Sequence, residues 1–157
     1  MVIISELLKY NERVRREYFE SLKKLSWEEF TKNREASFHS IRNIFIHILN
    51  AVDYWVSFLQ KEDFKLHRKF DEYETFQDIK EYMERVEKRM SNYLETLSPS
   101  KLNENYTVTD DDGKPYEVTA EDILIHVFEE EVHHRGELIA LLWQINVEPP
   151  MMSWKNL

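Results

Sequence analysis

The sequence contains no cysteine and very little glycine or proline. Its 157 residues include two Gly, four Pro and no Cys, so the chain can form no disulfide, no zinc–cysteine site and no protein thiolate. Because turn-forming residues are scarce, long helices with few connections are favoured. Any metal must therefore be held by histidine and carboxylate side chains, and any thiol chemistry must use a thiol that a substrate brings.

The sequence also lacks a basic surplus and a long apolar run. Its formal net charge is −9, from 21 Lys+Arg and 30 Asp+Glu, whereas a nucleic-acid-binding protein needs a basic surface. No apolar stretch approaches the roughly 18 residues of a membrane span. The N-terminal MVIISELLKYNERV has neither the basic start nor the cleavage site of a signal peptide. We therefore expect a cytoplasmic protein that binds neither nucleic acid nor membranes.

Apolar residues recur at helical spacing in most of the chain. The pattern predicts long amphipathic helices at about residues 3–25, 40–60, 75–97 and 120–145. The basic run at residues 13–16 is embedded in acidic residues and reads as a solvated helix face.

Two short elements are predicted between these helices. Ser26 and Glu29 have the spacing of a capping box, which predicts a short helix ending near Thr31. Asp112-Gly113 is a turn signal between two β-prone runs, residues 106–109 and 116–119, and predicts a small hairpin. The sequence therefore predicts one all-α domain over residues 1–157. Its fold is a four-helix bundle with a short extra helix after the first long helix and a β-hairpin before the fourth.

The last helix concentrates residues that can bind metals, in the stretch HVFEEEVHHRGE at 126–137. An amphipathic helix with a rich polar face is one interpretation of this stretch, and a metal site is the other. Helical spacing puts several acid–histidine pairs on one face. The possible pairs are Glu130/His134, Glu130/His133 and Glu131/His134.

His47 is a candidate for a further ligand because it lies in an otherwise apolar run of the second helix. A lone core histidine is the commoner case, but a neighbouring helix here offers partners. Two histidines and one carboxylate would leave a divalent ion with open positions, as in catalytic rather than structural sites. The nucleophile would then be a metal-bound water or thiolate, and no side chain is assigned as catalytic.

Two motifs resemble those of the DinB/YfiT-like bundle proteins. Ser40-Ile-Arg-Asn-Ile-Phe-Ile-His47 resembles that family's S-I-R-D-L-L-x-H, and residues 126–137 resemble H-x-x-x-H-x-x-x-H-R-G-Q. The resemblance covers essentially the whole chain. It implies that His47, Glu130 and His134 hold a divalent ion, with zinc first and nickel, manganese or iron as alternatives. Glu130 stands where many members have His.

The resemblance also implies roles for neighbours of the ligands. His126, Arg135 and Glu137 would surround the ligands without binding the ion, and Glu137 replaces the family's Gln. Gly136 is costly inside a helix, so we expect its missing side chain to let another helix, such as that of a dimer partner, pack close to the site.

The function that the resemblance implies is metal-dependent activation of a small thiol, such as bacillithiol or mycothiol, or of water. The nucleophile would attack a small electrophile, in a thiol transferase-like or hydrolase-like reaction, and the protein would be a homodimer. The alternative is a non-catalytic homodimer that binds a metal or a small ligand. A di-iron protein is disfavoured because its Glu-x-x-His motifs belong on two helices, and here both lie on one.

Overall fold

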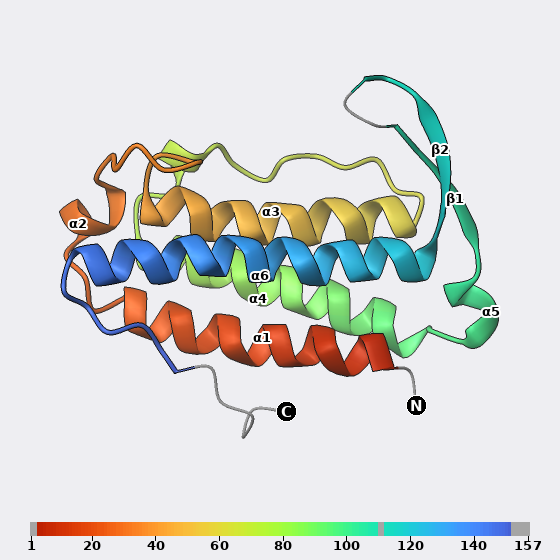
Figure 1. The fold of residues 1–157 in the computed structure, drawn as a ribbon, viewed down its shortest axis with the longest axis horizontal. Helices are drawn as coiled ribbons and strands as arrows, with labels where there is room; N and C mark the ends of the chain where they lie inside the picture. The colour runs from red at the N-terminus through yellow and green to blue at the C-terminus, as the bar shows by residue number, and fades with distance from the viewer. Residues whose placement is uncertain (1–2, 110–111, 152–157) are drawn as a thin grey trace.

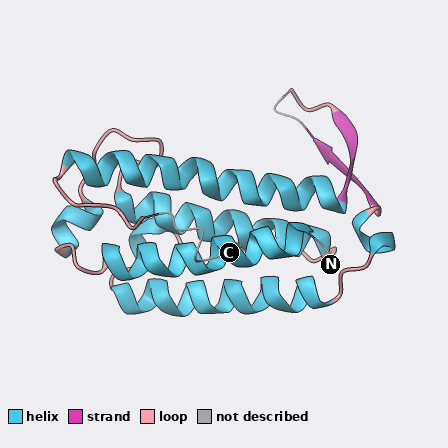
Figure 2. Ribbon diagram, turned by 60° about the horizontal axis from the view of Figure 1, so that its bottom comes forward, coloured by secondary structure: helices cyan, strands magenta, loops and turns pink. Residues whose placement is uncertain are grey.

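The computed structural model describes residues 3–109 and 112–151. Within these residues, four long helices lie lengthwise beside one another (Figures 1 and 2) and form a bundle. The bundle predicted from the sequence is therefore confirmed. The long helices are α1 (Ile3–Leu22), α3 (Ile41–Leu59), α4 (Phe76–Glu95) and α6 (Ala120–Gln144).

The short elements lie in the connections. The predicted short helix is α2 (Trp27–Thr31), and the predicted hairpin is β1 (Asn105–Thr109) paired antiparallel with β2 (Pro115–Thr119). The structure adds two elements that the sequence pattern did not predict: a 3-10 turn, η1 (Phe70–Glu72), and the one-turn helix α5 (Pro99–Leu102).

Side-chain caps fix the starts of the helices. Thr119 Oγ1 accepts a hydrogen bond from Asp122 N, and Asp122 Oδ2 accepts one from Thr119 N, which is a reciprocal capping box. Such a cap satisfies backbone N–H groups that have no partner within the helix. The other capping residues are Ser26 for α2, Ser40 for α3, Thr75 for α4 and Ser98 for α5.

The direction of the chain places α3 and α6 antiparallel and next to each other (Figure 1). After α3 the chain returns along the whole bundle through residues 60–75, so that α4 runs parallel to α3 (Figure 1). The hairpin stands at the end of the bundle where α3 ends and α6 begins (Figures 1 and 2).

The core contains charged residues as well as apolar ones. Arg15 is 4% exposed, so the interpretation of residues 13–16 as a solvated face is wrong at this position. Arg15 is buried because Glu131 of α6 and Glu87 of α4 neutralise it, and pairing between distant helices cannot be read from a local run. None of the helices in residues 3–109 and 112–151 is long and apolar enough to cross a membrane.

Candidate metal centre

Three ligand atoms from α3 and α6 converge on one point. Glu130 Oε1 lies 2.9 Å from His47 Nε2 and 3.1 Å from His134 Nε2. All three atoms lie within 4.8 Å of one another. Ligands bound at about 2.0–2.2 Å lie roughly 3 Å apart around a metal ion, so these residues could hold one. We call His47, Glu130 and His134 the triad.

The protonation of the triad also suits a cation. Burial raises the pKa of the Glu137 carboxyl, but hydrogen bonds from His134 and Ser37 outweigh this effect and lower the pKa. Glu137 Oε2 lies 2.6 Å from His134 Nδ1, and an ionised carboxylate can only accept, so this contact favours the tautomer with its proton on Nδ1. In a neutral imidazole, Nε2 then presents a lone pair to the carboxylate of Glu130. This contact needs a positive charge, from a proton on Nε2 or from a cation between the two atoms.

The remaining two groups of the triad favour the ligand forms. Burial lowers the pKa of His47, although the hydrogen bond to Glu130 opposes this shift. Burial raises the pKa of Glu130, but the hydrogen bond from His47 and the charge of His134 outweigh it, so the pKa is lowered overall. A neutral imidazole and an ionised carboxylate are the forms that bind a metal.

The loop between α2 and α3 covers one side of the triad. The Phe38 ring stacks on His47, with centroids 3.8 Å apart and planes at 19°, and meets His134 edge-on. Ser37 Oγ donates a hydrogen bond of 2.8 Å to Glu137 Oε2. The sequence interpretation missed both residues because the conformation of this loop carries no periodic signal. Their position directly before the Ser40–His47 motif was the available hint.

The residues next to the triad on α6 have different environments and contacts. Glu131, which spacing left open as a ligand, is 4% exposed and accepts a 2.9 Å hydrogen bond from Arg15 Nη1. His133 is exposed, and with His134 and Glu137 it forms a second group that could hold a metal. In that group the His134 atom facing Glu137 is Nδ1, whereas Nε2 faces Glu130.

The whole chain matches one protein family. Residues 1–156 match the DinB family. The chain belongs to the DinB family. It is also 27% identical over 150 residues to the uncharacterised Bacillus subtilis protein YizA, a match that covers 95% of this chain and 92% of YizA.

Solved structures show the same DinB fold. A DinB-like protein of Bacillus subtilis, YjoA, has a TM-score of 0.66 at 17% identity, covering 96% of this chain and 97% of that one. A DinB-like protein of Bacillus cereus has a TM-score of 0.68 at 15% identity, with 93% of each chain covered. A conserved protein of Enterococcus faecalis has a TM-score of 0.66 at 16% identity, covering 88% of this chain and 92% of that one. At these identities the likeness establishes the fold alone.

The three residues expected to surround the ligands of this DinB protein lie in different places. Glu137 contacts the triad directly through His134 Nδ1. Arg135 is buried and donates a hydrogen bond to Asn11 Oδ1 on α1, on the inner side of α6. His126 meets the ring of Trp55 edge-on, with centroids 5.3 Å apart, one helical turn before Glu130. The described contacts thus connect only Glu137 to the triad.

Gly136 lies on the exposed side of α6. A Cβ atom added there would meet no heavy atom within 4 Å in the part of the chain that the structure describes. No helix of residues 3–109 and 112–151 therefore packs against Gly136, so the described chain does not fill the space that its missing side chain leaves.

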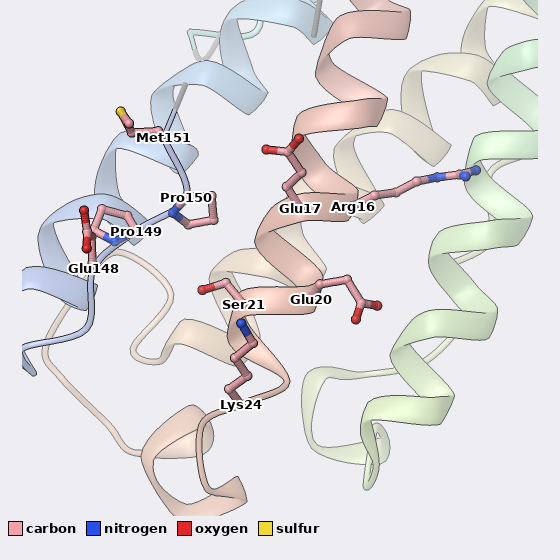
Figure 3. A pocket seen from close by; sticks show the side chains of 9 residues that line it. All are labelled: Arg16, Glu17, Glu20, Ser21, Lys24, Glu148, Pro149, Pro150 and Met151. Carbon is pink, nitrogen blue, oxygen red and sulfur yellow. The ribbon is translucent and has the colours of Figure 1, made fainter. Parts of the chain in front are cut away.

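A wide hollow lies away from the triad, and none of the triad residues lines it. It has a volume of about 630 Å³ and lies between α1 and residues 148–151 (Figure 3). Arg16, Glu17 and Glu20 line it on the α1 side. No histidine among the described residues lines it, and the acids and bases along it are exposed. We therefore assign the candidate site to the triad.

Proposed function

We propose that this DinB protein is a metal-dependent enzyme whose triad holds one divalent ion, zinc first among the candidates. The observation that carries this proposal is the convergence of His47, Glu130 and His134 within 4.8 Å of one another. The side chains of His47 and Glu130 are 23% and 26% exposed, so the donor set is open on one side to a small molecule. When bound, a divalent ion would lower the pKa of a thiol or a water and so supply a nucleophile at neutral pH.

The chain's own residues would prepare this site. Glu137 fixes the ring of His134 and the proton on Nδ1, which leaves Nε2 free to act as a donor atom. Phe38 covers one face of His47 and so limits the access of water from the α2–α3 loop.

A thiol is the nucleophile that we propose first. The chain has no cysteine, so the thiol must come from a small molecule such as bacillithiol or mycothiol, and the electrophile would be a second small molecule. Attack by water, which would make the protein a hydrolase, is the second form of the same proposal.

The test is a screen of thiol transfer and of ester and amide hydrolysis with zinc-loaded protein. His134→Ala should lose at least about a hundredfold in rate, because its ring supplies a donor atom, whereas His133→Ala, which changes the exposed neighbour, should keep the rate. Zinc-loaded wild-type protein without any turnover would contradict the proposal and favour a non-catalytic binding protein.

The proposal includes a homodimer through the exposed face of α6. Ile125, Val132 and Trp143 are 43%, 39% and 57% exposed on this face, and the open space at Gly136 lies among them. Apolar side chains and a glycine on one exposed stripe would suit a second helix packed closely. Light scattering should give a dimer that Val132→Arg converts to a monomer; a monomeric wild-type protein would contradict this part.

A further inference from the structure

A separate pocket lies at the hairpin end of the surface between α3 and α6. It has a volume of about 230 Å³. Elements far apart in the sequence build it: α3, both strands of the hairpin, and the first turns of α6. The apolar and aromatic residues that line it, together with one histidine, are Trp55, Val108, Tyr116, Val118, Ile123 and His126.

The hairpin contributes more apolar surface than it needs for its own packing. Tyr116 and Val118 lie two residues apart on β2 and therefore share a face, and Val108 is paired with Tyr116 in the register of the sheet. Val108 is 9% exposed, whereas the large ring of Tyr116 remains 50% exposed. The sheet face that begins in the core thus continues into solvent as one wall of the pocket.

The pocket lies on the same line as the triad. Along α3, His47 and Trp55 are eight residues apart, or about 12 Å at 1.5 Å per residue. Along α6, Glu130 and His126 are four residues apart, or about 6 Å. Because α3 and α6 run antiparallel, both steps lead from the triad towards the hairpin (Figure 1).

The lining defines the chemistry of a ligand. Trp55 and Tyr116 offer aromatic surfaces, and pockets of about 300–1,000 Å³ take drug-sized molecules, so about 230 Å³ suits a single ring. The lining includes the carboxylate of Asp122 and no lysine or arginine. Asp122 already accepts hydrogen bonds from Thr119 N and Oγ1. An anionic group is therefore disfavoured, and a neutral ring fits.

We propose that this pocket binds a neutral, ring-sized aromatic group of the substrate, with its reactive end directed along α3 and α6 to the triad. The inference that the ring binds here depends on the pocket alone. The direction towards the triad rests on the proposed function. The substrate would then span one to two helical turns, about 6–12 Å, between its ring and its reactive atom. His126 lines the pocket on the α6 side and would contact the bound ring.

The experiment uses two matched series of probes, ω-phenylalkyl alcohols and ω-phenylalkyl thiols of increasing chain length. The alcohols, titrated into metal-free protein, should shift the NMR signals of the Trp55 indole and of the β2 amides. Trp55→Ala and the milder Tyr116→Ala, which changes an exposed residue, should each weaken alcohol binding by about tenfold or more. Leu66→Ala removes an exposed apolar side chain that does not line the pocket, and it should leave binding unchanged.

The thiols, titrated into zinc-loaded protein, test the link to the triad. Their affinity should pass through a maximum at an intermediate chain length, and Trp55→Ala should remove this maximum while the shortest thiols bind as before. If the alcohols do not bind, or if they bind the Trp55→Ala and Tyr116→Ala variants as tightly as they bind the wild-type protein, the proposal that this pocket binds a ring is wrong. Alcohols that bind while no thiol binds would support the pocket and overturn the proposed thiol chemistry instead.

Discussion

Glu130 and Glu131 are adjacent in α6, yet they occupy opposite chemical environments. The side chain of Glu130 is 26% exposed, and its Oε1 is shared by the imidazoles of His47 and His134. Glu131 is 4% exposed and pairs with Arg15 of α1. One residue turns a helix by about 100°, which is enough to separate a candidate ligand from a buried ion pair.

The two carboxyls differ in what they are free to do. Burial raises the pKa of Glu131, and the charges of Arg15 and Arg135 oppose that shift without cancelling it. Its oxygens serve the contact between α1 and α6, whereas those of Glu130 face a partly open surface. A run of three glutamates can thus combine a structural role, that of Glu131, with a candidate chemical role, that of Glu130.

The largest effect is expected for Glu131→Ala. Arg15 would keep only the 3.6 Å contact with Glu87, and breaking a buried ion pair costs about 3–5 kcal/mol. Urea unfolding of the metal-free Glu131→Ala protein should show a loss of unfolding free energy near the lower end of this range. Glu131→Gln keeps the shape of the side chain and should lose less unfolding free energy. A loss under about 1 kcal/mol for Glu131→Ala would contradict the structural role.

Glu130→Gln should show the opposite pattern. The change removes a charged donor atom from the triad, so zinc affinity should fall by more than the ~10–100-fold typical of residues that only orient ligands. The free energy of unfolding of the metal-free protein should change by less than about 1 kcal/mol, because partly exposed pairs contribute little. Competition with a chelator measures the zinc affinity. An unchanged zinc affinity in Glu130→Gln would contradict the assignment of different roles to Glu130 and Glu131.

Glu137→Gln should have an intermediate effect on zinc affinity. The amide accepts a weaker hydrogen bond from His134 Nδ1 than a carboxylate does, and loss of such an orienting partner typically costs about 10–100-fold. Ser37→Ala is the matched control, because it removes only the second contact of Glu137 and should cost less. Equal losses in the two variants would show that Glu137 acts through the loop rather than through the ring.

The smallest effect is expected for His133→Ala. His133 is exposed and belongs only to the alternative group with His134 and Glu137, so zinc affinity should change by no more than about twofold, within the ±0.5 kcal/mol of an ordinary surface substitution. If His133→Ala instead weakens zinc more than Glu130→Gln does, the metal centre lies on the outer side of α6.

Most of the fold could be predicted because its signals are local. The spacing of apolar residues predicted the long helices, and Ser26, Thr75 and Thr119 marked helix starts that the structure confirms. Asp112-Gly113 marked the hairpin turn, where Gly113 has φ +77. The one-turn helix α5 was missed because Pro99 reads first as the end of the preceding helix.

The site could be predicted only in part, because it depends on contacts between distant segments. Spacing on α6 left three acid–histidine pairs open, and only the arrangement of α3 against α6 brings Glu130, rather than Glu131, to His47. The contribution of Phe38 depends on a loop conformation, which no periodicity specifies. The prediction that the triad binds a metal stays a prediction until an ion is measured.

The central claim is that one divalent ion is held by His47, Glu130 and His134. The most direct measurement is an anomalous X-ray difference map at the zinc edge, from crystals of untagged protein equilibrated with zinc and then dialysed. We predict one dominant peak per chain, within about 2.0–2.2 Å of His47 Nε2, Glu130 Oε1 and His134 Nε2. A dominant peak at His133, or a triad without any peak, would contradict the account.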